Sequence, residues 1–253
     1  MEKNTRNSLI GGGIAIASLV GVAFAFGNAP SGRQAEWTPP TSTFPQEQLV
    51  PAVGNGQLFG EYGLADLVDE EWLADTADAT GIPIRALRSY AGAEIAFSQG
   101  STQCNVDWST LAGVGFVESR HGTLQGGRIL DNGQQDPEIF GIPLDGQSST
   151  AEIPDTDGGV LDGDEVWDRA VGPMQFIPST WDYLGSDGNL DGVRDPQNMD
   201  DAVLAAGRHL CFNGGDLTNG DGWIDAVWSY NRSVEYNNAV ASAADRYRQA
   251  ASQ

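Results

Sequence analysis

The spacing of apolar residues is helical along most of the chain beyond residue 60. Residues 61–81 and 82–100 carry apolar side chains at intervals of three and four, and each stretch ends in a glycine, a common helix terminator. The same spacing predicts helices in residues 107–122, 172–185, 200–215, 221–231 and 234–248, with Gly172 and Pro173 starting the second of these. No stretch alternates convincingly between apolar and polar residues. We therefore expect a mainly α-helical fold with long irregular loops.

Two segments lack this periodicity. Residues 122–170 are rich in Gly, Asp and Pro, and a loop of such length within a compact domain is usually functional. Residues 28–59 are rich in Pro, Ser, Thr, Gly and Gln, which predicts a flexible linker. The folded domain should span residues 60–250, long enough for one sizeable core.

The N-terminal residues, 1–27, predict a signal peptide or a membrane anchor. Lys3 and Arg6 precede an uncharged, mostly apolar run from Leu9 to Phe26. This run is about as short as a membrane span can be, and it is long for the core of a cleavable signal. No clear cleavage site follows it, so an anchor is slightly favoured, and either reading places the domain outside the cytoplasm.

Export changes the interpretation of the two cysteines, Cys104 and Cys211. Outside the cytoplasm an isolated pair is most simply a disulfide, although two unpaired buried thiols are the alternative. No spacing between cysteine and histidine suggests a zinc or redox site.

Charge excludes one class of partner. The formal net charge is −22 with only 13 Lys and Arg, whereas nucleic-acid binding requires basic surface that neutralises phosphates. An acidic surface keeps an exported protein soluble and suits divalent cations.

The helix predicted over residues 107–122 carries the candidate chemistry. Trp108, Leu111, Gly115 and Glu118 share one stripe, so the buried face ends in a carboxyl group. Burial raises the pKa of a carboxyl group, which keeps it protonated near neutral pH, as a general acid requires. The alternative is a structural glutamate paired with a cation such as Arg120 or Arg128.

Three short motifs, one in each of three predicted helices, favour catalysis. They are "ESRHG" at 118–122, "GPMQFIPSTW" at 172–181 and "WSYNRS" at 228–233. In this order they resemble the lytic murein transglycosylase B family, in the compact exported form of high-GC Gram-positive bacteria, and the resemblance covers about residues 60–250. It implies a lysozyme-like helical domain that acts on peptidoglycan glycan strands as a monomer and needs no cofactor for its chemistry.

The resemblance also assigns roles to residues. Glu118 matches the single catalytic acid, and Ser119 matches a polar residue of the same motif. The substrate groove is implied to include Met174, Gln175, Phe176, Tyr230 and Asn231. Ser229 stands where many relatives carry alanine. The alternatives without a role in substrate binding are that Tyr230 and Trp181 are core aromatics and that Asn231 is a helix cap.

In the resembled family the glutamate cleaves the bond between N-acetylmuramic acid and N-acetylglucosamine without water and leaves a 1,6-anhydro end. Two other functions stay open. Attack by water would make the protein a hydrolytic muramidase, and a purely structural Glu118 would leave a calcium-dependent wall-binding module.

Residues 187–198 fit the first half of an EF-hand calcium loop. The predicted ligands are Asp187, Asn189, Asp191, the Val193 carbonyl and Asp195, with Gly192 at the turn. Position 12 holds Asn198 in place of glutamate, so calcium binding should be weak, and the alternative is an Asx-rich turn. A second acidic cluster, Asp155, Asp157, Asp162 and Asp164, is interpreted as a solvated loop. His121 and His209 are expected to have no catalytic role.

Overall fold

The structure is a computed structural model that describes residues 42–46, 48–101, 103–147 and 150–253. The predicted signal peptide or anchor, residues 1–27, lies outside these residues, as do residues 28–41 of the predicted linker. Among the described helices, none is both long and apolar enough to cross a bilayer.

The described part of the chain is mainly α-helical, as predicted, with seven α-helices, two short 3₁₀ helices and one two-stranded antiparallel sheet. In chain order the elements are η1 (Leu64–Asp66), α1 (Glu70–Thr80), α2 (Ile84–Gln99), α3 (Trp108–Ser119), η2 (Leu124–Gly126), β1 (Arg128–Ile129), β2 (Gln135–Asp136), α4 (Pro178–Leu184), α5 (Met199–Gly214), α6 (Gly220–Tyr230) and α7 (Val234–Ala251).

Short polar side chains fix where most of these helices begin. The side chain of the residue before the helix accepts a backbone N–H of the first turn in α1, α3, α5, α6 and α7, which satisfies a group that the helix itself leaves unpaired. The capping residues are Asp69, Asp107, Asn198, Asn219 and Ser233.

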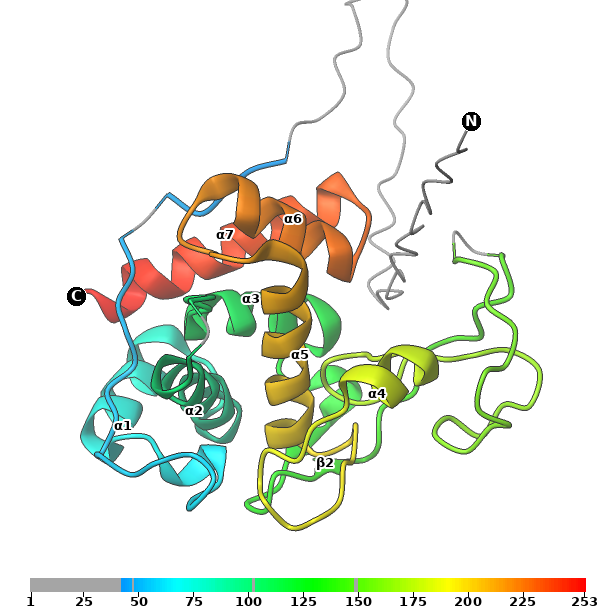
Figure 1. Cartoon of the computed structure of the whole chain (residues 1–253), viewed down its shortest axis with the longest axis horizontal. Coiled ribbons are helices and arrows are strands. Elements are labelled where there is room, and N and C mark those ends of the chain that lie inside the picture. Colours follow the sequence, from blue (N-terminus) through cyan, green and yellow to red (C-terminus); the bar gives the residue numbers. More distant parts are fainter. Residues whose placement is uncertain (1–41, 47, 102, 148–149) are drawn as a thin grey trace, which may run out of the picture.

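Helix α3 lies at the centre of the fold (Figure 1) and packs against α2 and α7, while α5 packs against α6. The sequence predicted one buried stripe, but nearly all of α3 is buried, including the polar Ser109 and Thr110. A helix that is apolar on all sides is typical of a core position. A buried ion pair between Asp107 and Arg248, 2.9 Å long, ties the start of α3 to the end of α7.

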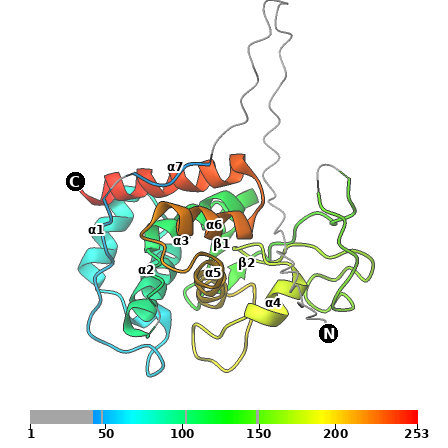
Figure 2. The same cartoon turned by 45° about the horizontal axis from the view of Figure 1, so that its top comes forward.

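Residues 42–46 and 48–59 form a mostly irregular segment, the N-terminal strap, which first runs along α7 (Figure 2) and then pairs with the residues between η1 and α1. Phe44 packs edge-on against Trp223 at 5.8 Å between ring centroids, and the Thr43 backbone N–H donates to Asn238. The indole of Trp108 donates to the Val50 carbonyl over 2.7 Å. These few aromatic and backbone contacts hold the described part of the predicted linker on the domain.

The irregular region between α3 and α4 lies beyond α5, on the side away from α1 and α2 (Figures 1 and 2). The prediction of a helix starting at Gly172 is wrong. Gly172 has φ +77° and Gln175 has φ +52°, and residues 172–176 form a tight turn that is closed by two backbone hydrogen bonds between Val171 and Phe176. Helix α4 begins at Pro178, which supplies the first-turn proline.

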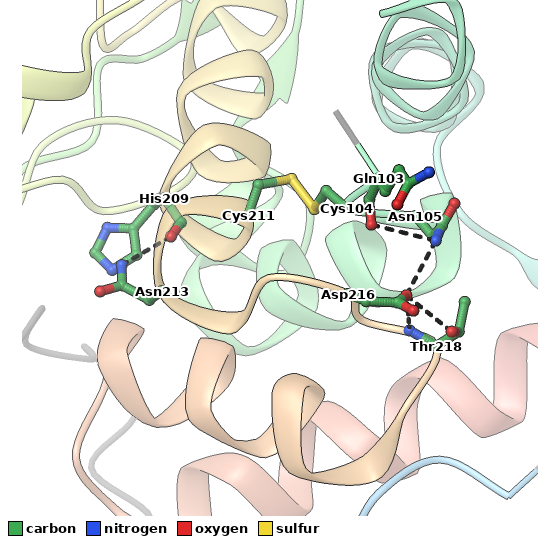
Figure 3. The surroundings of a disulfide bond; sticks show 8 residues. All are labelled: Gln103, Cys104, Asn105, His209, Cys211, Asn213, Asp216 and Thr218. Carbon is green, nitrogen blue, oxygen red and sulfur yellow. Dashed lines mark hydrogen bonds between the residues drawn. A yellow bond between two sulfur atoms is a disulfide. The ribbon is translucent and has the colours of Figure 1, made fainter. Parts of the chain in front are cut away.

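Cys104 and Cys211 form the predicted disulfide across 107 residues of sequence (Figure 3). The bond joins the segment before α3 to α5. Next to it, the Asn105 amide donates to Asp216 over 3.0 Å, and the Leu217 N–H donates to the Cys104 carbonyl. The disulfide therefore lies within a junction that holds α3, α5 and the start of α6 together.

Candidate active site

The side chain of Glu118 is fully buried near the end of α3. Burial raises the pKa of its carboxyl group to about 8, and a hydrogen bond from Tyr236 opposes this shift. No other group in the described part of the chain contributes to the shift, so the pKa is set without an ion pair. The predicted alternative, a salt bridge to Arg120 or Arg128, is absent from the described residues.

The two carboxyl oxygens of Glu118 differ. The Tyr236 hydroxyl donates to Oε1 over 2.5 Å, while Oε2 has no hydrogen-bond partner among the described residues. An unsatisfied buried oxygen costs about 1–3 kcal/mol. Such groups call for an explanation, and a site that receives a ligand is one.

Glu94 provides a comparison within the same protein. It is partly buried, and this burial together with the nearby charge of Asp107 raises its pKa to about 8. However, Oε1 of Glu94 accepts the Ala52 N–H and Oε2 accepts the Trp108 N–H. Both oxygens of Glu94 therefore join backbone segments, whereas Glu118 keeps one oxygen available.

Three motifs that are far apart in sequence meet around Glu118. From the end of α6, Tyr230 lies close enough that the negative charge of Glu118 raises the pKa of its phenol, after burial as the larger cause. The rings of Tyr230 and Tyr236 stack with a centroid separation of 6.5 Å. The Tyr230 hydroxyl donates to the Met174 carbonyl over 3.0 Å, which connects α6 to the 172–176 turn.

Ser119 connects the same turn to α3. Its hydroxyl donates to the Pro173 carbonyl over 2.6 Å and accepts the Gly122 N–H over 2.8 Å. Both hydrogen-bonding directions of the hydroxyl are thus used within the protein. In this structure Ser119 holds the turn beside the catalytic candidate.

Met174, Gln175 and Phe176 are all fully buried in the turn. The Gln175 amide nitrogen donates to the Gly172 carbonyl over 2.8 Å, and its Oε1 has no partner among the described residues. Phe176 packs between Trp181 and Tyr230, at 5.4 and 5.9 Å. The turn therefore places a second unsatisfied oxygen in the part of the fold that holds Glu118.

Asn231 is the residue that ends α6, where its N–H donates to the Val227 carbonyl. Trp181 is buried against Phe176, whereas Tyr183 is 69% exposed and lies edge-on to Phe212. Of the two aromatics on α4, Trp181 is therefore a core residue.

Sequence reasoning missed Tyr236 and the surroundings of His121. His121 is buried, with hydroxyl groups of Tyr90 and Tyr247 at 3.0 and 2.8 Å from its two ring nitrogens. A Cβ at Gly115 would lie 1.9 Å from the Tyr90 hydroxyl oxygen, so this glycine is what lets Tyr90 reach its position. Tyr236 is the third residue of α7 and is capped by Ser233, but no sequence spacing relates it to Glu118.

The predicted calcium loop closes on itself through its own side chains. Asp187 accepts the N–H groups of Asp191 and Gly192, and Asp191 accepts that of Val193. In the described part of the chain, the carboxylates of this loop do not converge within 4.8 Å as a group of three.

The end of that loop departs furthest from an EF-hand. The Asn198 side chain caps α5, and Asp201 accepts the N–H groups of Gly188 and Asp195. Burial raises the pKa of Asp201 to about 7. The residue at position 12 of the predicted loop is thus used as a helix cap, and Asp201 holds the two ends of the loop.

The other acidic cluster is an ordered loop. Asp155, Asp157 and Asp168 bring carboxylate oxygens within 4.8 Å of one another. Asp155 and Asp157 accept backbone N–H groups of residues 157–161, and Asp164 pairs with Arg169 over 2.8 Å. Hydrogen bonds from backbone N–H groups thus stabilise the carboxylates of this loop.

With this geometry in hand, comparison with known proteins adds no relative: no family model matches the chain, and no curated protein or solved structure is significantly similar to it.

Proposed function

We propose that the protein is a peptidoglycan lytic transglycosylase with a lysozyme-like helical domain, in which Glu118 acts first as acid and then as base. The observation that carries the proposal is the Glu118 carboxyl group, which is buried, protonated up to about pH 8 and unpaired at Oε2. It lies where the three motifs that resemble the family come together.

The two states of one carboxyl group suffice for this reaction. Protonated Glu118 donates to the oxygen that joins C1 of N-acetylmuramic acid to N-acetylglucosamine, and that bond breaks. The 2-acetamido group of the muramic acid stabilises the resulting cation. The Glu118 carboxylate then removes the proton of the C6 hydroxyl, and O6 bonds to C1 to leave a 1,6-anhydro end, without consuming water.

The surroundings of Glu118 support a single-carboxylate reaction. Two-carboxylate glycosidases hold their acids about 5–9.5 Å apart, where each charge influences the other. Among the described residues, no acid contributes to the pKa shift of Glu118. Tyr236 stabilises the carboxylate form through its hydrogen bond, which suits a group that must also act as a base.

One observation favours a different function. Glu118 is fully buried, as a structural residue would be, and catalysis requires that Oε2 become accessible to the glycan. A wall-binding module with a structural Glu118 is therefore the second candidate. The disulfide supports an extracytoplasmic location under either function.

The deciding experiment is mass spectrometry of soluble products released from purified peptidoglycan by the full protein and by Glu118→Gln. Products one water lighter than hydrated muropeptides, absent with the variant, establish a lytic transglycosylase. Hydrated, reducible ends that also vanish with the variant establish a muramidase. No release by either folded protein favours the binding module.

Glu94→Gln is a matched control, because Glu94 is partly buried and has a similarly raised pKa but has both oxygens hydrogen-bonded within the protein. Assayed below its melting temperature, it should retain cleavage. Loss of cleavage in both variants would indicate that either substitution disturbs the fold, not the chemistry.

A further inference from the structure

A pocket of about 650 Å³ lies beside the C-terminal end of α3, between the end of α1 and α7. The side chains that line it combine cations, aromatic rings and hydroxyl groups: Thr80, Pro83, Phe116, Arg120, His121, Thr123, Arg246 and Tyr247. We name it the Arg120–Arg246 pocket. Neither Tyr230 nor Tyr236 lines it, and it is therefore separate from the site around Glu118.

Two guanidinium groups gather over a single aromatic ring there. The guanidinium carbon of Arg120 lies 4.2 Å from the centroid of the Phe116 ring, and that of Arg246 lies 4.8 Å from it. Arg246 lies equally close to the ring of Tyr247. The aromatic faces hold both cations by cation–π attraction, so their position does not depend on an acid.

Neither arginine is paired with a carboxylate among the described residues, although the chain carries 35 Asp and Glu against 13 Lys and Arg. Five other arginines form ion pairs, whereas Arg194, Arg208 and Arg232 also have no carboxylate partner among the described residues; the five are Arg85, Arg88, Arg128, Arg169 and Arg248. What distinguishes Arg120 and Arg246 is that both lie over one aromatic ring. The two guanidinium carbons lie at most about 9 Å apart, because both lie near the same ring centroid. Like charges at this range repel each other, and a bound anion would relieve the repulsion.

The effect of the two charges reaches the wall of the pocket. After burial as the larger cause, Arg246 and Arg120 lower the pKa of His121, to about 3. His121 is therefore neutral at physiological pH. The positive potential of the pocket comes from the two arginines, and it persists over the whole neutral range.

The chemistry of the pocket points to one class of ligand. A guanidinium group binds a carboxylate through two parallel hydrogen bonds, and Pro83, Phe116 and Tyr247 offer an apolar surface beside it. The volume greatly exceeds that of an inorganic anion. We propose that the Arg120–Arg246 pocket binds the carboxylate end of a short peptide, with a small apolar side chain against Phe116 and Tyr247.

The proposed function gives this peptide a source, because the strands that Glu118 would cleave carry short peptide stems that end in carboxylates. Arg120 follows Glu118 by two residues, so their Cα atoms lie within about 7.6 Å of each other. The stem identity thus rests on the proposed function, but binding of a peptide carboxylate does not.

Isothermal titration of the full protein with D-alanyl-D-alanine tests the proposal, with the C-terminal amide of the same dipeptide as the uncharged control. We expect binding of the acid and at least about tenfold weaker binding of the amide, the effect of one charge-assisted hydrogen-bonded pair. Arg120→Gln and Arg246→Gln should each weaken binding of the acid about tenfold.

Arg128→Gln is the matched control variant, because it removes one positive charge from an exposed arginine that does not line the pocket. It should bind the acid as the unmodified protein does. Equal binding of acid and amide, or equal loss in all three variants, would overturn the proposal. No detectable binding of the acid to unmodified protein that unfolds cooperatively, and is therefore folded, would also overturn the proposal.

Titration with inorganic phosphate tests the alternative ligand. If phosphate binds the pocket more tightly than the dipeptide and displaces it, the pocket belongs to a phosphate-bearing ligand and the peptide is wrong. Because the titration needs no cleavage, a negative result in the peptidoglycan assay leaves its outcome unaffected.

Discussion

The phenol of Tyr236 donates a hydrogen bond to Oε1 of Glu118 across 118 residues of sequence. This bond fixes the rotamer of the carboxyl group and leaves Oε2 as the oxygen without a partner among the described residues. It also favours the ionised form of Glu118, against the much larger effect of burial. The pair therefore sets both the orientation and the proton affinity of the candidate acid.

Replacing Tyr236 by phenylalanine should raise the pKa of Glu118, because the hydrogen bond that lowers it is lost. Under the proposed function, the alkaline limb of the cleavage rate should move to higher pH, and the maximal rate should fall by about tenfold as the carboxyl group loses its orientation. Cleavage rates measured from pH 5 to 10 test both effects. Tyr183→Phe, on an exposed ring, should leave the profile unchanged.

Glu118 should also make stability depend on pH. The folded protein retains the Glu118 proton up to about pH 8, whereas the unfolded chain releases it near pH 4.5. Between these values the folded state binds more protons, so the free energy of unfolding falls as pH rises, by at most about 1.4 kcal/mol per pH unit for one group. Glu118→Gln removes this loss.

The variant should therefore gain stability relative to the unmodified protein as the pH increases from 5 to 9, in urea unfolding followed by circular dichroism. Glu94 and Asp201, with pKa values raised to about 8 and 7, act in the same direction in both proteins, so only the difference reports on Glu118. A difference that stays constant with pH would show that the Glu118 pKa is not raised.

The 172–176 turn depends on Gly172. A Cβ at this position would lie 1.8 Å from the Pro196 carbonyl oxygen, and the residue also has a positive φ of +77°. Gly158 has nearly the same φ, +75°, but open space where a Cβ would be. Gly158→Ala should cost about 1 kcal/mol from backbone strain alone, and Gly172→Ala several times more, because Pro196 must move. If both variants lose the same free energy of unfolding in urea, Pro196 moves away from the added Cβ without a measurable cost.

Loss of the disulfide should destabilise the whole domain, because it closes a loop of 107 residues. The chain-entropy model gives an upper value of about 4–5 kcal/mol for such a loop. The Cys104→Ser, Cys211→Ser double variant should melt roughly 10 °C lower by scanning calorimetry. A melting temperature within experimental error of the original would place the stability of this junction in its hydrogen bonds.

Calcium is expected to bind the 187–195 loop weakly. At ten times its dissociation constant it should stabilise the protein by about 1.4 kcal/mol, seen as a higher melting temperature that a chelator reverses. Asp187→Asn should abolish this response, because Asp187 is the first predicted ligand. If the chelator leaves the melting temperature of the original protein unchanged, the loop is an Asx-rich turn that Asp201 closes.

Local signals in the sequence predicted where several helices begin, although the helix predicted over residues 61–81 begins only at Glu70. Asp107, Asn219 and Ser233 each stand before an apolar period, and the helices begin at the next residue in each case. The turn at Gly172 was missed because its conformation follows from the close approach of Pro196, which lies 24 residues further along the chain. The spacing of apolar residues does not reveal such a contact. The contact of Phe44 with one distant tryptophan could not be predicted from the composition of residues 28–59 either.

The candidate site likewise combines residues that the sequence predicts with residues that only tertiary packing brings together. The burial of Glu118 is predictable from the apolar spacing of its own helix. The motifs that contain Met174 and Tyr230 are recognisable as short local sequences. Tyr236 is not, since its relation to Glu118 arises from the packing of α7 on α3. Arg120 and Arg246 likewise meet over Phe116 through that packing alone.

The N-terminal strap also determines how the domain would respond to mechanical force. Thr43 and Gln46 bond to Asn238 and Asp245, so the strap runs in the same direction as α7 and its contacts follow one another along the chain. Tension between a point ahead of residue 42 and the C-terminal end of α7 would pull the strap lengthwise along the helix, so these contacts would share the load. The strap and α7 would therefore resist such a force in shear, as one mechanical unit.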